Sequence, residues 1–245
     1  MTKDLFSLQA SDYAKYRPHY PPALFDFLAT LTPRRDLAWD CGTGNGQAAV
    51  ALAKYFRRII ATDPSEKQLS NAVANSRVEY RKGSAEKTSI ESRTVDLVTV
   101  AQAFHWFQFD AFFAEVRRVC RPQGSAIAIW TYAICQITPE IDSIVNHYYH
   151  DIVGAYWEPE RRYVEEGYVN QPFPFIPVAT PAMHLEAQWP FDHFHGYLRS
   201  WSATQTAAKR LGADPLEHTT EPLRKAWGLA ERTVSWPLAL RVGRL

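Results

Sequence analysis

Apolar runs of strand length alternate with helical patterns through the first half of the chain. The run 95–101 is almost continuously apolar and β-branched, as expected of a strand buried on both faces of a sheet. Such alternation predicts βαβ units and therefore a mostly parallel sheet with helices on both faces. The predicted strands are 37–40, 58–62, 78–81, 95–101 and 125–132. The predicted helices are 23–30, with Pro22 at its start, 47–55, 65–75 and 109–120.

Beyond residue 132 the alternation breaks. Residues 137–156 have a helical pattern, whereas 171–181 holds four prolines and predicts an irregular loop. Two late strands are predicted over 183–189 and 233–242, although Pro237 fits the second only at an edge or a strand start. Helical stretches near 197–202 and 222–228 separate them. Together with the first five strands, these predict a seven-stranded sheet with an insertion after the fifth.

The length of 245 residues is compatible with one large domain carrying an appended lid. We expect a single domain in four parts. They are an N-terminal flap over 1–35, a ligand-binding core over 36–132, an insertion or lid over 133–182, and C-terminal strands and helices over 183–245.

Composition narrows the functional classes. Lys+Arg of 27 against Asp+Glu of 26 leaves a net charge of +1, so no global field favours nucleic acid or an anionic membrane. The polar N-terminus and the lack of a long apolar run predict a cytoplasmic protein without a membrane partner. Cys41, Cys120 and Cys135 are widely spaced and odd in number, which predicts reduced thiols. The 13% aromatic content fits either an aromatic-lined pocket or the core of the insertion.

A Gly-rich loop follows the first strand. Asp40-Cys41-Gly42-Thr43-Gly44-Asn45-Gly46 stands where a strand turns into a helix, the position at which such a loop brings backbone close to a nucleotide-like ligand. Asp63 ends the next strand, where a carboxylate can accept hydrogen bonds from a ribose diol. The alternative is that Asp63-Pro64-Ser65 only opens a helix. The GxGxG spacing differs from the GxGxxG of nicotinamide-binding loops and disfavours an oxidoreductase.

These residues resemble the class I S-adenosylmethionine-dependent methyltransferases, and among them the small-molecule group that includes trans-aconitate methyltransferase. The resemblance covers nearly the whole chain and implies a Rossmann-like fold. It rests on Tyr13-Ala14-Lys15-Tyr16-Arg17-Pro18, the loop from Asp40 to Gly46, Ala61-Thr62-Asp63-Pro64-Ser65, Gly83-Ser84-Ala85-Glu86 and Ala101-Gln102-Ala103-Phe104-His105-Trp106-Phe107.

The resemblance implies a set of cofactor contacts. The Gly-rich loop holds the methionine portion of S-adenosylmethionine, Asp63 the ribose, and Ala85 and Glu86 flank the adenine. Tyr16 and Arg17 reach the methionine carboxylate from the N-terminal flap, or else form a plain surface turn. The cofactor-binding residues expected on this basis are Tyr16, Arg17, Asp40, Gly42, Thr43, Gly44, Gly46, Gln47, Asp63, Ser84, Ala85, Glu86, Gln102 and Ala103.

His105 and Trp106 are the candidate catalytic residues because they follow the fourth strand, at the carboxyl end of the sheet where ligands bind in open α/β folds. His105 can orient or deprotonate an acceptor, or it can be a buried His with a structural hydrogen bond. Candidate substrate residues follow from position alone, in the insertion and the C-terminal segment, and they offer aromatic walls and cationic groups. They are Trp130, Tyr132, Tyr149, Trp157, Arg161, Arg162, Arg199 and Trp201.

The sequence predicts no metal, because His184, His193 and His195 with Glu186 and Asp192 match no ligand spacing. The predicted activity is transfer of a methyl group to a small-molecule acceptor, releasing S-adenosylhomocysteine. A carboxylate oxygen is one such acceptor, and it needs no base, whereas a neutral hydroxyl, amine or thiol does. The alternatives are a non-catalytic S-adenosylmethionine-binding module and an NAD-linked oxidoreductase. The oligomeric state is open.

Overall fold

The computed structural model describes residues 16–245 of the chain. These residues form two compact units, the sheet unit (20–132, 162–183 and 238–245) and the helical unit (16–19, 133–161 and 184–237). The predicted flap and the predicted insertion are each divided between the two units. The expectation of a single domain stays a prediction.

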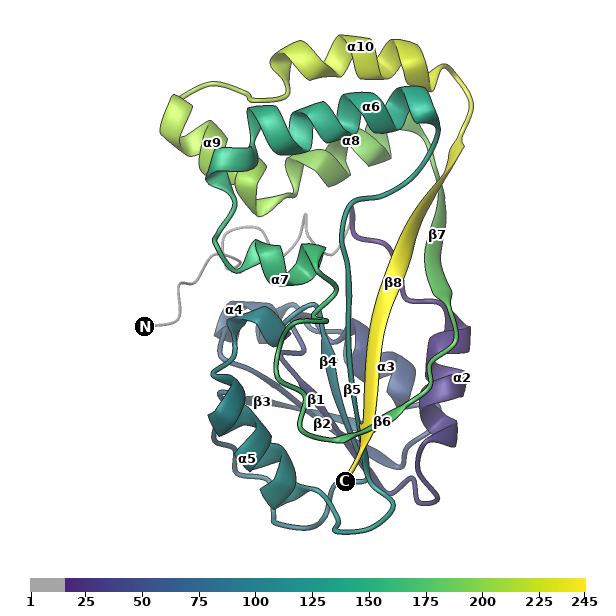
Figure 1. The fold of residues 1–245 in the computed structure, drawn as a ribbon, viewed down its shortest axis with the longest axis vertical. Coiled ribbons are helices and arrows are strands. Elements are labelled where there is room, and N and C mark those ends of the chain that lie inside the picture. The colour runs from purple at the N-terminus through teal and green to yellow at the C-terminus, as the bar shows by residue number, and fades with distance from the viewer. Residues whose placement is uncertain (1–15) are drawn as a thin grey trace. The chain divides into compact units, whose positions relative to one another are not determined.

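The sheet unit contains strands in the order β3-β2-β1-β4-β5-β8-β6 (Figure 1). The first five pair in parallel, and β8 runs antiparallel to both β5 and β6. This order confirms the predicted Rossmann-like sheet of seven strands. The strands are β1 (Leu37–Cys41), β2 (Arg58–Asp63), β3 (Val78–Lys82), β4 (Leu97–Ala101), β5 (Ala126–Tyr132), β6 (Ile176–Val178) and β8 (Arg232–Arg244).

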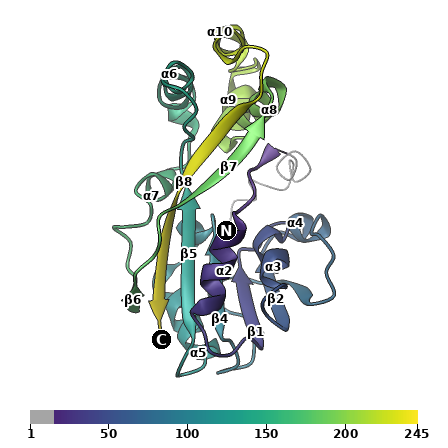
Figure 2. The same cartoon turned by 90° about the vertical axis from the view of Figure 1, so that its right-hand side faces the viewer.

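Helices cover both faces of this sheet. Successive side chains of a strand point to opposite faces, so one face collects Ala38, Ile59 and Leu97 against α2 (Pro22–Thr30) and α3 (Gln47–Leu52). Figure 2 shows these two helices side by side. On the other face Trp39 contacts Phe112 of α5 (Phe109–Val119), with ring centroids 6.1 Å apart.

The strand order reverses between β1 and β4. After β1 the chain moves outward to β2, and after β4 it moves to β5 on the other side. In open α/β sheets, ligands bind outside the carboxyl ends of the strands at such a switch point. The Gly-rich loop after β1 and the residues from Gln102 to Trp106 after β4 both begin there.

The helical unit is built on α6 (Pro139–His147), α8 (Phe191–Arg199) and α10 (Glu217–Trp227), with α9 (Ser202–Leu211) packed on α8 (Figure 1). Aromatic side chains fill it: Phe194 stacks on Trp227 with centroids 4.8 Å apart, and the indole of Trp236 donates to the Tyr197 hydroxyl. In this unit the start of β8 pairs with β7 (Met183–Trp189), where Gln188 donates to Thr233 at 2.7 Å.

Several predicted elements differ from the structure. The helix predicted over 137–156 is three pieces, α6, a π-helical turn η3 (Tyr148–Ile152) and a 3-10 turn η4 (Gly154–Tyr156). Tyr148 and Tyr149, the first two residues of the π turn, are both buried. Sequence reasoning missed α9, and it predicted α3 and α4 (Glu66–Ser70) too long.

The prolines also proved compatible with strands. The loop predicted over 171–181 contains β6, whose Pro177 is tolerated because β6 is the edge of the sheet. Pro237 lies inside β8 but precedes the residues that pair with β5, which begin at Leu238. Its missing N–H therefore costs that ladder no hydrogen bond.

Candidate functional site

Asp40, near the end of β1, is the buried carboxyl at the start of the Gly-rich loop. Its side chain is 1% exposed and accepts hydrogen bonds from the hydroxyls of Thr43 at 2.6 Å and Thr99 at 2.7 Å. Thr99 stands directly opposite Asp40 in the parallel β1–β4 register, so the carboxylate ties the loop to the neighbouring strand. Burial raises the pKa of Asp40 from 3.8 to about 6, against the opposing effect of the two hydroxyls.

The three glycines of the loop adopt positive φ, and each has different surroundings. A Cβ at Gly46 would stand 2.1 Å from the Tyr80 hydroxyl, and one at Gly42 would stand 2.5 Å from the Cβ of Ala103. At Gly44 (φ +57°) a Cβ would meet no atom of the described residues within 4 Å. The backbone at Gly44 therefore has open space over it, and a bound molecule can approach it closely.

Asp63 at the end of β2 is held against the same loop. Its carboxylate accepts the backbone N–H of Gly44 at 2.9 Å and that of Ser65 at 2.9 Å. Ser65 itself caps α4 by accepting the N–H of Gln68 at 3.3 Å. In the sequence Asp63-Pro64-Ser65, Ser65 is therefore the residue that caps the helix, while Asp63 connects the turn to Gly44.

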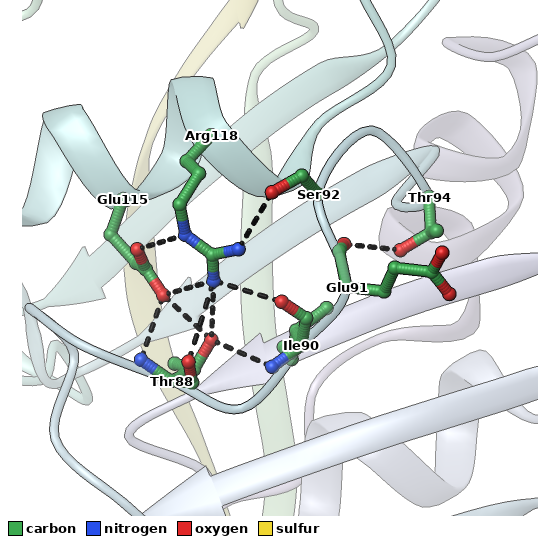
Figure 3. A network of polar contacts seen from close by, with 7 residues as sticks. All are labelled: Thr88, Ile90, Glu91, Ser92, Thr94, Glu115 and Arg118. Carbon is green, nitrogen blue, oxygen red and sulfur yellow. Dashed lines mark hydrogen bonds and ion pairs between the residues drawn. The ribbon is translucent and has the colours of Figure 1, made fainter.

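The segment holding Ser84, Ala85 and Glu86 is fastened to helix α5. Glu115 accepts the backbone N–H and the hydroxyl of Thr88, both at 2.7 Å, and pairs with Arg118 at 2.7 Å (Figure 3). Arg118 also donates to the carbonyl of Ile90 and the hydroxyl of Ser92. Glu86 accepts the N–H of Gln108 at 3.1 Å. This clasp, which sequence reasoning missed, sets the course of the loop between β3 and β4.

Gln102 is a strained residue at the end of β4. Its φ of +54° lies in the left-handed region, which costs a non-glycine residue about 1–2 kcal/mol. Its side chain holds the position by donating to the Tyr132 carbonyl at 2.9 Å and accepting from the Thr131 hydroxyl at 2.5 Å. Strain stabilised by such contacts is typical of functional sites.

His105 lies in the 3-10 turn η2 (Phe104–Trp106) immediately after Gln102 and Ala103. Its Nδ1 is 2.8 Å from the hydroxyl of Tyr168, and the two rings are near-parallel, with centroids 6.1 Å apart. Trp106 lies beside His105 at 4.7 Å. Both candidate catalytic side chains are half-buried. Tyr168 was not predicted, because its contact with His105 spans 63 residues and leaves no local signal.

Four of the candidate substrate residues form one cluster in the helical unit. Tyr149, Trp157 and Trp201 have ring centroids within 6 Å of one another. The guanidinium of Arg161 lies 4.6 Å from the Trp157 ring centre and 5.4 Å from that of Tyr149, and its Nε donates to the Tyr149 hydroxyl at 2.7 Å. Within residues 16–245 this guanidinium makes no ion pair.

Trp130 and Tyr132 belong instead to the end of β5 in the sheet unit. Trp130 is 0% exposed and lies edge-on against Tyr20 and Phe25. Tyr132 is 4% exposed, and its carbonyl accepts from Gln102. The contacts of Trp130 are those of a core residue, in a strand that is buried along its whole length.

Tyr16 and Arg17 pack on helix α8 in the helical unit. The Tyr16 ring lies against Gly196, where an added Cβ would stand 2.4 Å from it, and edge-on to His193 at 5.2 Å. Arg17 lies over the Tyr197 ring at 5.4 Å and donates to the Ser200 carbonyl at 3.4 Å. Tyr13, Ala14 and Lys15 lie outside the described residues. The predicted contact with the cofactor stays a prediction.

The cysteines are buried and free, as expected of reduced thiols. Residues 16–245 bring together no set of three His, Cys, Asp or Glu side chains that could hold a metal ion. No helix in this part of the chain has both the length and the apolar character needed to cross a bilayer.

Comparison with known proteins identifies the family. Residues 39–128 match the model of the methyltransferase domain. A methyltransferase of Dictyostelium discoideum is 39% identical over 228 residues, which are 91% of this chain and 86% of that protein. The structure of a type II methyltransferase from Anaeromyxobacter dehalogenans is 44% identical, with a TM-score of 0.87, and the match covers 94% of this chain and 98% of that one.

A third relative names the cofactor. The S-adenosylmethionine-dependent methyltransferase of Saccharomyces cerevisiae is 28% identical over 174 residues, 64% of this chain and 58% of that protein. The chain therefore spans little more than half of the yeast relative. The seven-stranded sheet with its Gly-rich loop and acidic turn, together with these matches, shows that the chain belongs to the class I S-adenosylmethionine-dependent methyltransferases. This membership decides against the oxidoreductase and the non-catalytic module.

Proposed function

We propose that the protein methylates a small organic acid on a carboxylate oxygen, as the sequence resemblance to the trans-aconitate methyltransferase group suggests. The observation that carries this proposal is Arg161. A guanidinium that lies over two neighbouring aromatic rings, with no acidic partner among the described residues, suits a planar carboxylate that forms two parallel hydrogen bonds.

The residues of the sheet unit fit the cofactor. Support comes from the open space over Gly44 and from the carboxylate of Asp63 beside it. Gly42, Thr43, Gly44, Gly46 and Gln47 would hold the methionine portion, and Asp63 the ribose. Ser84, Ala85 and Glu86 would flank the adenine, and Gln102 and Ala103 would border the reacting group. Asp40, whose carboxylate accepts from the hydroxyls of Thr43 and Thr99, would hold the loop in place around the methionine portion.

When bound, S-adenosylmethionine supplies an electrophilic methyl group on a positively charged sulfur. An acceptor oxygen placed in line with that carbon–sulfur bond would take the methyl group, and the electron pair of the broken bond would remain on the sulfur of S-adenosylhomocysteine. A carboxylate loses its charge in this step without releasing a proton, so the protein's contribution is to position the two reactants and exclude water. His105 and Trp106 are the proposed residues at the reacting atoms.

The cofactor assignment is tested by thermal unfolding with S-adenosylhomocysteine. A ligand at about 100 times its dissociation constant adds about 2.7 kcal/mol of stability. We expect this shift with S-adenosylhomocysteine and none with NADH, and we expect Asp63→Asn to weaken it. Asp110→Asn, which makes the same change at an exposed carboxyl of α5, is the matched control. An equal shift in the Asp63 variant would contradict the assignment.

The acceptor class is tested by release of S-adenosylhomocysteine in the presence of small mono-, di- and tricarboxylic acids and of their amides. Acids should react and amides should not. Arg161→Gln should raise KM for the acid at least tenfold, as expected for the loss of one charged hydrogen-bonded contact of about 1.5–3 kcal/mol. Arg210→Gln is the control, because Arg210 is an exposed arginine that also stacks on a tyrosine. Turnover of the amides alone would overturn the proposal.

A further inference from the structure

The chemistry of His105 depends on which of its ring nitrogens carries the proton, and the hydroxyl of Tyr168 is a neighbour that bears on this. The Tyr168 hydroxyl is 2.8 Å from Nδ1 of His105, which is hydrogen-bonding distance. In a neutral imidazole one nitrogen donates and the other accepts. The partner of Nδ1 therefore sets what Nε2 can offer to an acceptor.

Tyr168 is held in place by the sheet unit from several sides. Its side chain is 0% exposed, and its φ of +61° follows that of Gly167 at +60°, so two successive residues are left-handed. Arg241 of β8 donates to the carbonyl of Tyr168, and the same nitrogen donates to the carbonyl of Gln171 at 2.9 Å. Phe104 lies edge-on to the phenol ring at 5.3 Å. The strained backbone is thus fixed by specific contacts, as at sites where position matters.

The direction of the hydrogen bond follows from the two partners. A neutral phenol is a better donor than acceptor, because the ring withdraws electron density from its oxygen. The unprotonated nitrogen of an imidazole is in turn a better acceptor than a phenol oxygen. The favoured arrangement is therefore Tyr168 O–H donating to Nδ1, with the proton of His105 on Nε2.

We propose that Tyr168 is a positioning residue that donates to Nδ1 of His105 and keeps Nε2 protonated, so that His105 donates a hydrogen bond to the acceptor and does not act as its base. This inference rests on the proposed function and deepens it. An Nε2–H group can orient a carboxylate oxygen, whereas it cannot remove a proton from a hydroxyl, amine or thiol. The pair therefore favours an acceptor that is already anionic.

The test is nitrogen NMR of protein labelled with ¹⁵N-histidine at neutral pH. The chain has 8 histidines, and the His105 signals are assigned by their loss in His105→Gln. We expect a signal typical of an unprotonated nitrogen at Nδ1 and of a protonated nitrogen at Nε2. Tyr168→Phe removes the hydroxyl and keeps the ring, and it should move both signals toward a mixture of tautomers. Tyr163→Phe, whose hydroxyl accepts from Arg162 at 3.1 Å, is the control and should leave both signals in place.

The opposite proton placement in the unmodified protein would overturn the inference, and so would an unchanged spectrum in Tyr168→Phe. The wild-type spectrum decides the tautomer even if that variant does not fold. Failure to methylate any acid would refute the proposed function but would leave the tautomer result intact, so the two failures are distinguishable. With a reactive acid in hand, Tyr168→Phe should lower kcat about fivefold to tenfold, the effect of one hydrogen bond, and leave KM for S-adenosylmethionine unchanged.

Discussion

The buried carboxyl of Asp40 should make the stability of the fold depend on pH in an unusual direction. Burial raises its pKa from 3.8 to about 6, so the folded protein binds a proton more tightly than the unfolded chain. The protonated carboxyl therefore adds to the free energy of unfolding at low pH. This contribution is fully present below about pH 4 and is lost as the pH rises through about 6. At about 1.36 kcal/mol per pKa unit, the whole effect is about 3 kcal/mol.

Asp40→Asn isolates this contribution. The amide keeps the size of the side chain but cannot ionise, so the variant should lose this part of the pH dependence. We expect the free energy of unfolding of the wild type, measured relative to the variant by urea titration, to fall by about 2.4 kcal/mol between pH 4 and pH 7, because part of the whole effect is already lost at pH 4. Asp110→Asn removes an exposed carboxyl in the first turn of α5 and should keep the wild-type profile. Parallel pH profiles for the wild type and Asp40→Asn would refute the reasoning.

Three further predictions concern the loop, the clasp and the thiols. Gly46→Ala should destabilise the fold by more than Gly44→Ala, because only a Cβ at Gly46 would clash with Tyr80. Both variants should weaken the binding of S-adenosylhomocysteine, measured by calorimetry. Equal stability of the two variants would contradict the packing argument. Arg118→Met should lower the free energy of unfolding by about 2 kcal/mol, which is less than for a fully buried ion pair because the Arg118 side chain is 38% exposed. The same variant should speed amide hydrogen exchange over residues 84–94. Unchanged exchange would mean that the clasp does not hold the segment. Burial raises the pKa of Cys120 to about 12 and also raises the pKa of Cys41 and of Cys135. The thiols of the folded protein should therefore resist a disulfide reagent at pH 8 and react only at the rate of unfolding. A rapid reaction of the folded protein would contradict this prediction.

Local patterns were sufficient for much of the sheet unit. Each of the first five strands lies within two residues of its predicted bounds. Four of them are largely buried on both faces and therefore require a run of apolar residues, whereas β3 is only half-buried. The Gly-rich loop was predicted equally well, because the positive φ angles at Gly42, Gly44 and Gly46 favour glycine. In the helical unit the prediction was poorer, because α9 carries its small buried residues Ala203, Thr204 and Ala207 among polar ones and shows no strong apolar stripe.

The candidate site shows where sequence reasoning stops. The chain by itself determined the fold class, the loop from Asp40 to Gly46 and the placement of Asp63 and His105 after their strands, because each depends on residues close together in sequence. Only the tertiary structure decided that Thr99 engages Asp40, that Arg118 and Glu115 clasp the segment after β3, and that Tyr168 meets His105. The partners in two of these contacts are about 60 residues apart, and in the clasp Glu115 reaches Thr88 across 27, so the contacts exist only because the sheet brings separate strands and loops together.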